Sequence, residues 1–243
     1  MIAVKLGGSV ITEKDRTETI DDAALDRVAA TVAGHDGPIV VVHGGGSFGH
    51  PAAQRYGLSP TAGTRDAAAV RDVHDAMRRL NDAVIDRLAD HGGAPVPVHP
   101  FSAGARDRDG RLSFPTAQVG TLLEEGFCPV LHGDVVAHAG RGATILSGDE
   151  LVVALASDLD ADRIGLCSTV PGVLDADDTV ISRIQSRDAV TTLGASDATD
   201  VTGGMAAKVQ TLLGAGVPAA VFGVDDLEAF LGGAAVGTTV DGR

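Results

Sequence analysis

The chain has 243 residues, of which 44% are hydrophobic and 3% aromatic, and 19 Lys and Arg stand against 33 Asp and Glu, a formal net charge of −14. This charge excludes a nucleic-acid binder that works through a basic surface, and it argues against a polybasic membrane-surface protein. No apolar run approaches the ~20 residues of a membrane span, and the N-terminus has no signal-like segment, so we expect a cytoplasmic protein.

Composition within each charge class is uneven, with 27 Asp against 6 Glu and 16 Arg against 3 Lys. This skew predicts a halophilic protein, because carboxylates keep a surface hydrated in concentrated salt and screening removes most self-repulsion. A GC-rich genome is the alternative explanation. Cys128 and Cys167 lie far apart and are expected to be buried thiols, not a metal site or a disulfide.

Short β-branched runs bounded by glycine predict buried strands. In chain order they lie at 2–6, 39–42, 129–131, 163–167 and 218–222. Helices are expected to begin near 21–22 and near 47, and to cover 66–91, 149–159 and 204–214. The polar stretch 102–114 is expected to form a hairpin or an excursion from the sheet. This alternation predicts one α/β domain over 1–243 with a mainly parallel sheet, divided into lobes of about 1–150 and 151–243.

The three lysines, Lys5, Lys14 and Lys208, all lie in or beside glycine-rich turns. An ammonium is a compact point charge, whereas a guanidinium is a planar fork, so a site for a transferring phosphoryl group can require Lys in a chain that otherwise uses Arg. Chance placement among 32 glycines is the alternative. The flanking patterns favour the functional interpretation.

Three glycine clusters offer backbone amides to an anion. KLGGS follows the first strand, HGGGSFGH follows the second, and TGG opens the last predicted helix. None of them is a Walker A loop or a dinucleotide fingerprint. His50 ends the second cluster and is expected to touch the ligand, while His43 is expected to orient that loop. Asp149 caps a helix or orients Lys5 and Lys208, and Asp134 is a weaker candidate of the same type.

These segments, together with SGDE, STVPGVLDAD and TGGMAAKV, resemble the amino acid kinase family over nearly the whole chain. The resemblance implies an open α/β/α sandwich that transfers the ATP γ-phosphoryl group. Within the family, HGGGSFGH with its terminal histidine is similar to the isopentenyl phosphate kinases, and the fosfomycin-resistance kinases are similar here. The family commonly has a TDVDGVY-like segment where this chain has STVPGVLDAD.

The resemblance also implies the site. The catalytic residues would be Lys5, Lys14, His50, Asp149 and Lys208. The acceptor phosphate would be bound by Gly45, Gly49, His50 and Gly148, and ATP by Lys5, Gly7, Gly8, Ser9, Gly46, Thr169, Gly172, Asp175, Gly204 and Lys208. An apolar tail would lie against Val73, Met77, Leu80 and Ile145, for which core packing is the alternative. Mg²⁺ would be held by the ATP phosphates and not by a protein metal site, and a homodimer is implied.

The implied reaction converts ATP and isopentenyl phosphate into ADP and isopentenyl diphosphate, with no nucleic-acid or membrane partner. Two alternatives remain open. One is a kinase of another phosphate or phosphonate acceptor such as fosfomycin, and the other is a non-catalytic module that binds nucleotides or oxyanions. Retention of the three lysines, His50 and Asp149 argues against the second.

Overall fold

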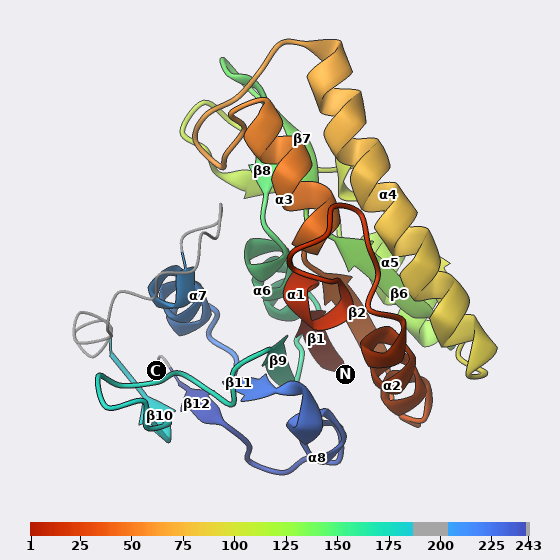
Figure 1. Cartoon of the computed structure of the whole chain (residues 1–243), viewed down its shortest axis with the longest axis vertical. Coiled ribbons are helices and arrows are strands. Elements are labelled where there is room, and N and C mark those ends of the chain that lie inside the picture. Colours follow the sequence, from red (N-terminus) through yellow and green to blue (C-terminus); the bar gives the residue numbers. More distant parts are fainter. Residues whose placement is uncertain (187–203, 242–243) are drawn as a thin grey trace.

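The computed structural model describes residues 1–186 and 204–241. Within these ranges the main sheet has eight strands in the order β10, β12, β11, β9, β1, β2, β6, β3 (Figure 1). In chain order they are β1 (Ile2–Leu6), β2 (Ile39–His43), β3 (Pro95–Pro97), β6 (Cys128–His132), β9 (Arg163–Ser168), β10 (Arg183–Ile184), β11 (Ala219–Gly223) and β12 (Thr238–Val240). Neighbours from β11 to β3 are parallel, and β12 runs antiparallel to β11. The prediction of a mainly parallel sheet is confirmed, and each predicted strand is part of it.

Helices cover both faces of this sheet. They are α1 (Gly8–Ile11), α2 (Asp22–Ala33), α3 (Gly46–Arg55), α4 (Ala67–Asp90), α5 (Ala117–Glu124), α6 (Gly148–Asp158), α7 (Gly204–Leu213) and α8 (Leu227–Leu231). Alternate side chains of β1 and β2 enter two separate apolar clusters. One cluster includes side chains of α2, α3, α4 and α8, and the other those of α5, α6 and α7. The fold is therefore the α/β/α sandwich that the resemblance implied.

The long helix α4 shows how the sequence sets these elements. Asp66 caps its first turn by accepting a hydrogen bond from the amide of Ala68 at 2.8 Å. Val73, Leu80 and Val84 recur at helical spacing and are at most 2% exposed. Burying this stripe against the sheet stabilises the helix, which fills the predicted range 66–91 to within one residue at each end.

A second, smaller sheet lies behind the upper part of α3 in Figure 1. Its strands are β4 (Ala105–Arg106), β5 (Leu112–Ser113), β7 (Asp134–His138) and β8 (Gly142–Leu146), in the order β5, β4, β7, β8. The hairpin expected in 102–114 is confirmed, because β4 and β5 pair antiparallel. The hairpin of β7 and β8 is an element that the sequence analysis does not predict.

The chain order creates a crevice at one edge of the main sheet. From β1 the chain proceeds to β2 and β6 on one side, and it later returns to β9 on the other side of β1. The loops that follow β1 and β9 therefore lead in different directions and leave a gap outside the carboxyl ends of the strands.

Both cysteines are free thiols, and burial raises the pKa of each to about 12. None of the helices in the described ranges is long and apolar enough to cross a membrane.

Candidate functional site

A cavity of about 620 Å³ lies at the carboxyl ends of the parallel strands. The residues that directly follow β1, β2, β6 and β9 all line it, namely Gly7, Gly44, Gly133 and Thr169. Its position is the one expected for a ligand site in an open parallel sheet. The predicted catalytic residues also line it: Lys5, Lys14, His50, Asp149 and Lys208. Tertiary structure thus gathers segments that are up to about 200 positions apart in the sequence.

Two glycine turns form the floor of this cavity by direct backbone contact. A Cβ on Gly8 would lie 2.1 Å from the amide nitrogen of Gly46, and a Cβ on Gly46 would lie 2.3 Å from Oγ1 of Thr12. Gly46 also has a φ of +47°, which favours glycine. The turn after β1 is tied to β9 as well, because the amide of Gly7 donates to the carbonyl of Cys167 at 2.8 Å. Only glycine fits this approach.

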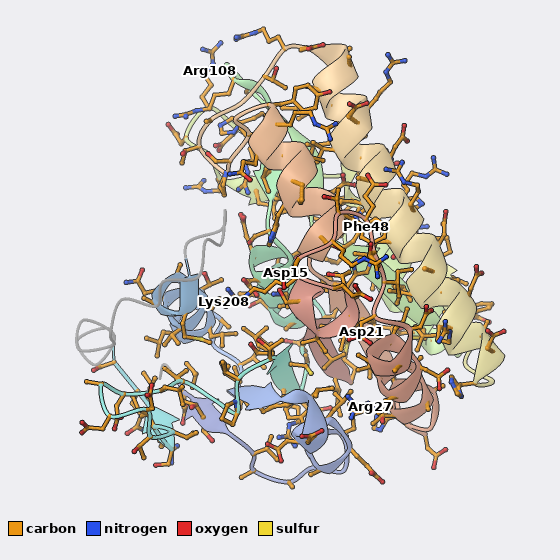
Figure 2. All side chains as sticks on the ribbon, in the orientation of Figure 1. Asp15, Asp21, Arg27, Phe48, Arg108 and Lys208 are labelled. Carbon is orange, nitrogen blue, oxygen red and sulfur yellow. The ribbon has the colours of Figure 1, made fainter. Side chains whose placement is uncertain are left out.

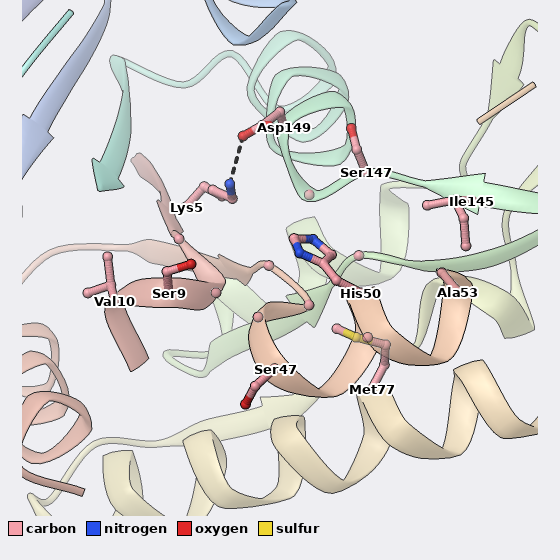
Figure 3. Close-up of a pocket in the computed structure, with 18 of the residues that line it drawn as sticks. Lys5, Ser9, Val10, Ser47, His50, Ala53, Met77, Ile145, Ser147 and Asp149 are labelled. Atoms are coloured by element: carbon pink, nitrogen blue, oxygen red, sulfur yellow. Dashed lines mark ion pairs between the residues drawn. The ribbon is translucent and has the colours of Figure 1, made fainter. Parts of the chain in front are cut away.

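Lys5 and Asp149 form a buried ion pair beside these turns. Nζ of Lys5 lies 2.9 Å from Oδ1 of Asp149, and the two residues are 7% and 6% exposed. Figure 3 shows the pair between the turn after β1 and the first turn of α6. Ser147 caps α6 by accepting from the amide of Glu150 at 3.1 Å, so Asp149 sits inside the first turn and is not the cap. Of the two roles considered for Asp149, the geometry places it against Lys5.

The other two lysines of the cavity come from different elements. Lys14 and Asp15 lie in the loop that follows α1, and Lys208 lies on α7 (Figure 2). The Gly203 part of the TGG cluster lies outside the described residues, whereas Gly204 begins α7 and lines the cavity. The cavity therefore has lysines both in the amino-terminal and in the carboxyl-terminal part of the chain.

His50 lies one turn into α3, and its ring points toward the first turn of α6 in Figure 3. Helix α3 begins at Gly46, so its dipole favours an anion in the same space. Most other predicted contact residues also line the cavity: Gly7, Gly8, Ser9, Gly45, Gly46, Gly49, Gly148, Thr169 and Gly204. Their specific roles toward a ligand stay predictions.

One end of the cavity is apolar. Val73 and Met77 of α4 and Ile145 of β8 line it, as the sequence predicted. A Cβ on Gly49 would lie 2.4 Å from the sulfur of Met77, so glycine at this position leaves room for the methionine. Leu80, the fourth residue predicted here, does not line the cavity. It is fully buried in the core between α4 and the sheet, because it lies about one turn farther along the helix than Met77.

Two residues predicted near the nucleotide also lie outside the cavity lining. A Cβ on Gly172 would lie 2.8 Å from Oγ1 of Thr238, so this glycine serves close packing. The carboxylate of Asp175 accepts hydrogen bonds from the amides of Asp177 and Thr179 at 2.9 and 3.0 Å, which closes a turn. Both positions fall in the segment where the chain departs from the family pattern.

Several lining residues were missed by the sequence analysis, among them Asp15, Gln54, Ser147 and Met205. Ser147 could have been found from its spacing to Glu150, which is that of a capping box.

Asp134 also lines the cavity, but its carboxylate already accepts from Nδ1 of His74 at 2.9 Å. This hydrogen bond raises the pKa of His74 above its ordinary value.

Two histidines stabilise the turns from behind. His43 and His132 are register partners at the ends of β2 and β6. Each places Nδ1 within 3.1 Å of the carbonyl oxygen of the following glycine, Gly44 or Gly133. Burial lowers the pKa of His43 to about 4 and that of His132 well below its ordinary value, so both rings are neutral. The expectation that His43 orients the loop agrees with this contact.

Since the pKa of His43 is lower in the folded than in the unfolded chain, its unfolded form binds the extra proton as the pH falls. We therefore expect the free energy of unfolding to decrease below about pH 6.5, with His43 contributing about 1.4 kcal/mol per pH unit until about pH 4. In His43→Gln the free energy of unfolding should fall less steeply with pH, by about 1.4 kcal/mol per pH unit, because one proton fewer is bound on unfolding. Urea unfolding over a pH series measures this slope. His35→Gln, at a position away from His43 and His132, is the control. An unchanged slope in His43→Gln would contradict the lowered pKa of His43.

Comparisons with known proteins show which proteins this chain is similar to. The profile described as "Amino acid kinase family" matches residues 1–216. A Haloferax volcanii protein named isopentenyl phosphate kinase is 59% identical over 246 residues, which cover 100% of this chain and 99% of that protein. A protein of the same name from Methanothermobacter thermautotrophicus is 36% identical, covering 88% and 86% of the two chains. A solved structure titled "X-ray structures of isopentenyl phosphate kinase" has a TM-score of 0.84 at 28% identity, covering 98% of this chain and 99% of that chain.

Proposed function

Because this chain belongs to the amino acid kinase family, we propose that it is an isopentenyl phosphate kinase, which transfers the γ-phosphoryl group of ATP to isopentenyl phosphate. The products are ADP and isopentenyl diphosphate. The structural observation that carries the proposal is one cavity whose floor is lined by glycines and lysines and whose far end is apolar. Full-length likeness to the Haloferax volcanii kinase supports isopentenyl phosphate as the acceptor.

Phosphoryl transfer needs positioning and charge stabilisation more than covalent participation of the protein. A phosphate monoester is largely ionised near neutral pH, so the acceptor oxygen needs no strong general base. Lys5 and Lys14 stabilise the negative charge of the transferring group, and Lys208 binds the ATP phosphates. Asp149 holds Lys5 in place through their 2.9 Å ion pair. The amides of the two glycine turns contact the phosphate oxygens of both substrates.

His50 donates a hydrogen bond to the acceptor phosphate, assisted by the backbone of Gly45, Gly49 and Gly148. The apolar end beside Val73, Met77 and Ile145 accommodates the five-carbon tail. Burying about four methylene equivalents contributes ~3 kcal/mol to binding. Such a pocket discriminates weakly between similar tails, so dimethylallyl phosphate and other short alkyl phosphates are also substrates.

Magnesium fits this cavity as an ion carried by ATP. The described residues hold no group of three or more His, Cys, Asp or Glu side chains that could form a metal site. Asp149 already pairs with Lys5, and Asp134 with His74. Mg²⁺ commonly binds through substrate phosphates and retained waters, where it neutralises phosphate charge. An Mg²⁺ ion carried by the ATP phosphates is therefore part of the proposal.

The remaining features of the proposal concern organisation and environment. Residues 1–150 hold the acceptor, while 151–243 contribute Thr169, Gly204 and Lys208 to the nucleotide side. The protein works as a homodimer, in line with its family, and in the cytoplasm, where its donor ATP is supplied. Its charge of −14 suits a halophilic cell.

An assay of ADP release tests the function directly. With MgATP and isopentenyl phosphate we expect turnover, and kcat/KM should rise with salt toward the molar range, because both substrates are anions and molar salt shortens the Debye length to ~3 Å. Fosfomycin is the parallel acceptor. Turnover of fosfomycin but not of isopentenyl phosphate would show that the acceptor proposed here is wrong. Tight ATP binding with no turnover of any phosphate monoester would favour a non-catalytic module. A steady fall of kcat/KM from low salt, with the fold intact by circular dichroism, would refute the halophilic expectation.

Replacing His50 tests its contact with the acceptor. His50→Ala should lose most of kcat/KM for isopentenyl phosphate while ATP binding persists, because the lost hydrogen bond is to the acceptor phosphate alone. His91→Ala is the matched control, since His91 lies at the far end of α4 and pairs with Asp26 at 3.0 Å. Wild-type kcat/KM for the acceptor in His50→Ala would show the assignment to be wrong.

Replacing Lys14 tests stabilisation of the transition state. Lys14→Ala should lower kcat by on the order of 100-fold and raise KM for ATP much less, because the charge acts on the group in transfer. Arg16→Ala is the control in the same loop, where Arg16 pairs with Glu13 at 3.0 Å. An effect confined to KM for ATP would reduce Lys14 to a residue that binds the ground state.

A further inference from the structure

The turn between β8 and α6 supplies an unbroken stretch of the cavity wall. We call residues 145–150, from the end of β8 to the first turn of α6, the turn 145–150. Its five residues from Ile145 to Asp149 all line the cavity. Asp149 holds Lys5, and Gly148 borders the expected acceptor phosphate. The turn joins β8 of the small sheet to α6 on the main sheet, so its position depends on how these two layers are held together.

One side chain reaches both ends of this turn. Arg106 of β4 donates from Nη1 and Nη2 to the two carboxylate oxygens of Glu150, both at 2.6 Å. Its Nη2 also lies 3.3 Å from the carbonyl oxygen of Ile145, to which it donates. The side chain is 6% exposed and thus held within the protein. We propose that Arg106 is a positioning residue that fixes the turn 145–150, and with it Asp149 and Gly148, for the proposed phosphoryl transfer.

The geometry requires arginine at this position. Two parallel hydrogen bonds to one carboxylate need the planar fork of a guanidinium, and a lysine can contact only part of this set. Two further hydrogen bonds, from Nη2 to the carbonyl of Ile145 and from Nη1 to the carbonyl of Gly110 at 3.0 Å, come from the same planar group. We call the contacts of Arg106 with Glu150 and Ile145 the clamp. Because the guanidinium is buried, salt screens its pair with Glu150 far less than it screens exposed pairs, so the clamp persists in concentrated salt.

The clamp acts on one side of the cavity. Loosening it shifts Asp149 relative to Lys5 and shifts Gly148 relative to the acceptor phosphate. Misplacement by about 1 Å can cost on the order of 100-fold in rate. The nucleotide side rests on the turn after β1 and on α7, neither of which Arg106 contacts through a described hydrogen bond. A loss of kcat and a higher KM for the acceptor should therefore accompany an almost unchanged KM for ATP.

Arg106→Lys is the test variant, and Arg163→Lys is its matched control. Arg163 begins β9 at the end of the strand away from the cavity, donates to the carbonyl of Ala234 at 2.8 Å and lies over the ring of Phe230. Its replacement disturbs packing without touching the turn. We expect kcat to fall by about tenfold or more in Arg106→Lys and by less than about twofold in Arg163→Lys, with melting temperatures measured for both.

Glu150→Gln tests the other half of the pair and serves if Arg106→Lys fails to fold, since the Glu150 side chain is 33% exposed. It should reproduce the same pattern in kcat and KM, and the double variant should be no worse than the more damaging single one. Wild-type kcat in both single variants, losses that multiply in the double variant, or an equal loss in Arg163→Lys would overturn the proposal.

Hydrogen exchange separates this inference from the proposed function on which it rests. Amides of 145–150 should exchange faster in Arg106→Lys than in the wild type and should be unchanged in Arg163→Lys, whatever acceptor the enzyme uses. If the wild type fails to turn over isopentenyl phosphate but this exchange pattern is found, the function is wrong and the clamp stands. Unchanged exchange in Arg106→Lys would refute the clamp.

Discussion

Backbone contact between the turns that follow β1 and β2 determines the shape of the cavity. Gly8 and Gly46 approach so closely that neither position can carry a Cβ. Since β1 and β2 are parallel neighbours, both turns leave the sheet at the same edge. Their contact fixes the start of α3, and the first turns of this helix then place His50 on the same cavity as Lys5. A side chain at either glycine would separate the two halves of the floor.

The electrostatics of the cavity are local and differ from those of the protein as a whole, because three lysines and three aspartates line the cavity of a strongly acidic chain. The chain carries a net charge of −14, yet two anionic substrates are proposed to meet in a cavity lined by its three lysines. Burying the Lys5–Asp149 pair costs solvation free energy, which the contact at 2.9 Å offsets in part. The pair is therefore better understood as fixing the position of an ammonium group than as a source of stability. In concentrated salt such short contacts persist while the field of the acidic surface is screened.

Several features of the site could not be inferred from the sequence, and each depends on contacts between distant segments. His43 and His132 lie far apart in the chain but become register partners, and both bind the carbonyl of the next residue. Arg106 lies in a polar stretch expected to form a hairpin or an excursion from the sheet, and its proposed role follows from its contact with Glu150, which is 44 residues away. Leu80 shares the apolar stripe of Met77, and only the position of α4 along the sheet decides which of the two lines the cavity.

Local pattern determined much of this protein. Glycine-bounded β-branched runs predicted five strands of the main sheet, helical spacing predicted α4, and glycine turns with attached lysines predicted residues that line the cavity, because backbone conformation and side-chain volume act over a few residues. Tertiary structure alone decided which lining residues meet. It placed Asp149 on Lys5, removed Leu80, Gly172 and Asp175 from the lining, and joined Arg106 to the turn before α6. The reason is physical: contacts across layers depend on strand order and helix rotation, which no single segment encodes.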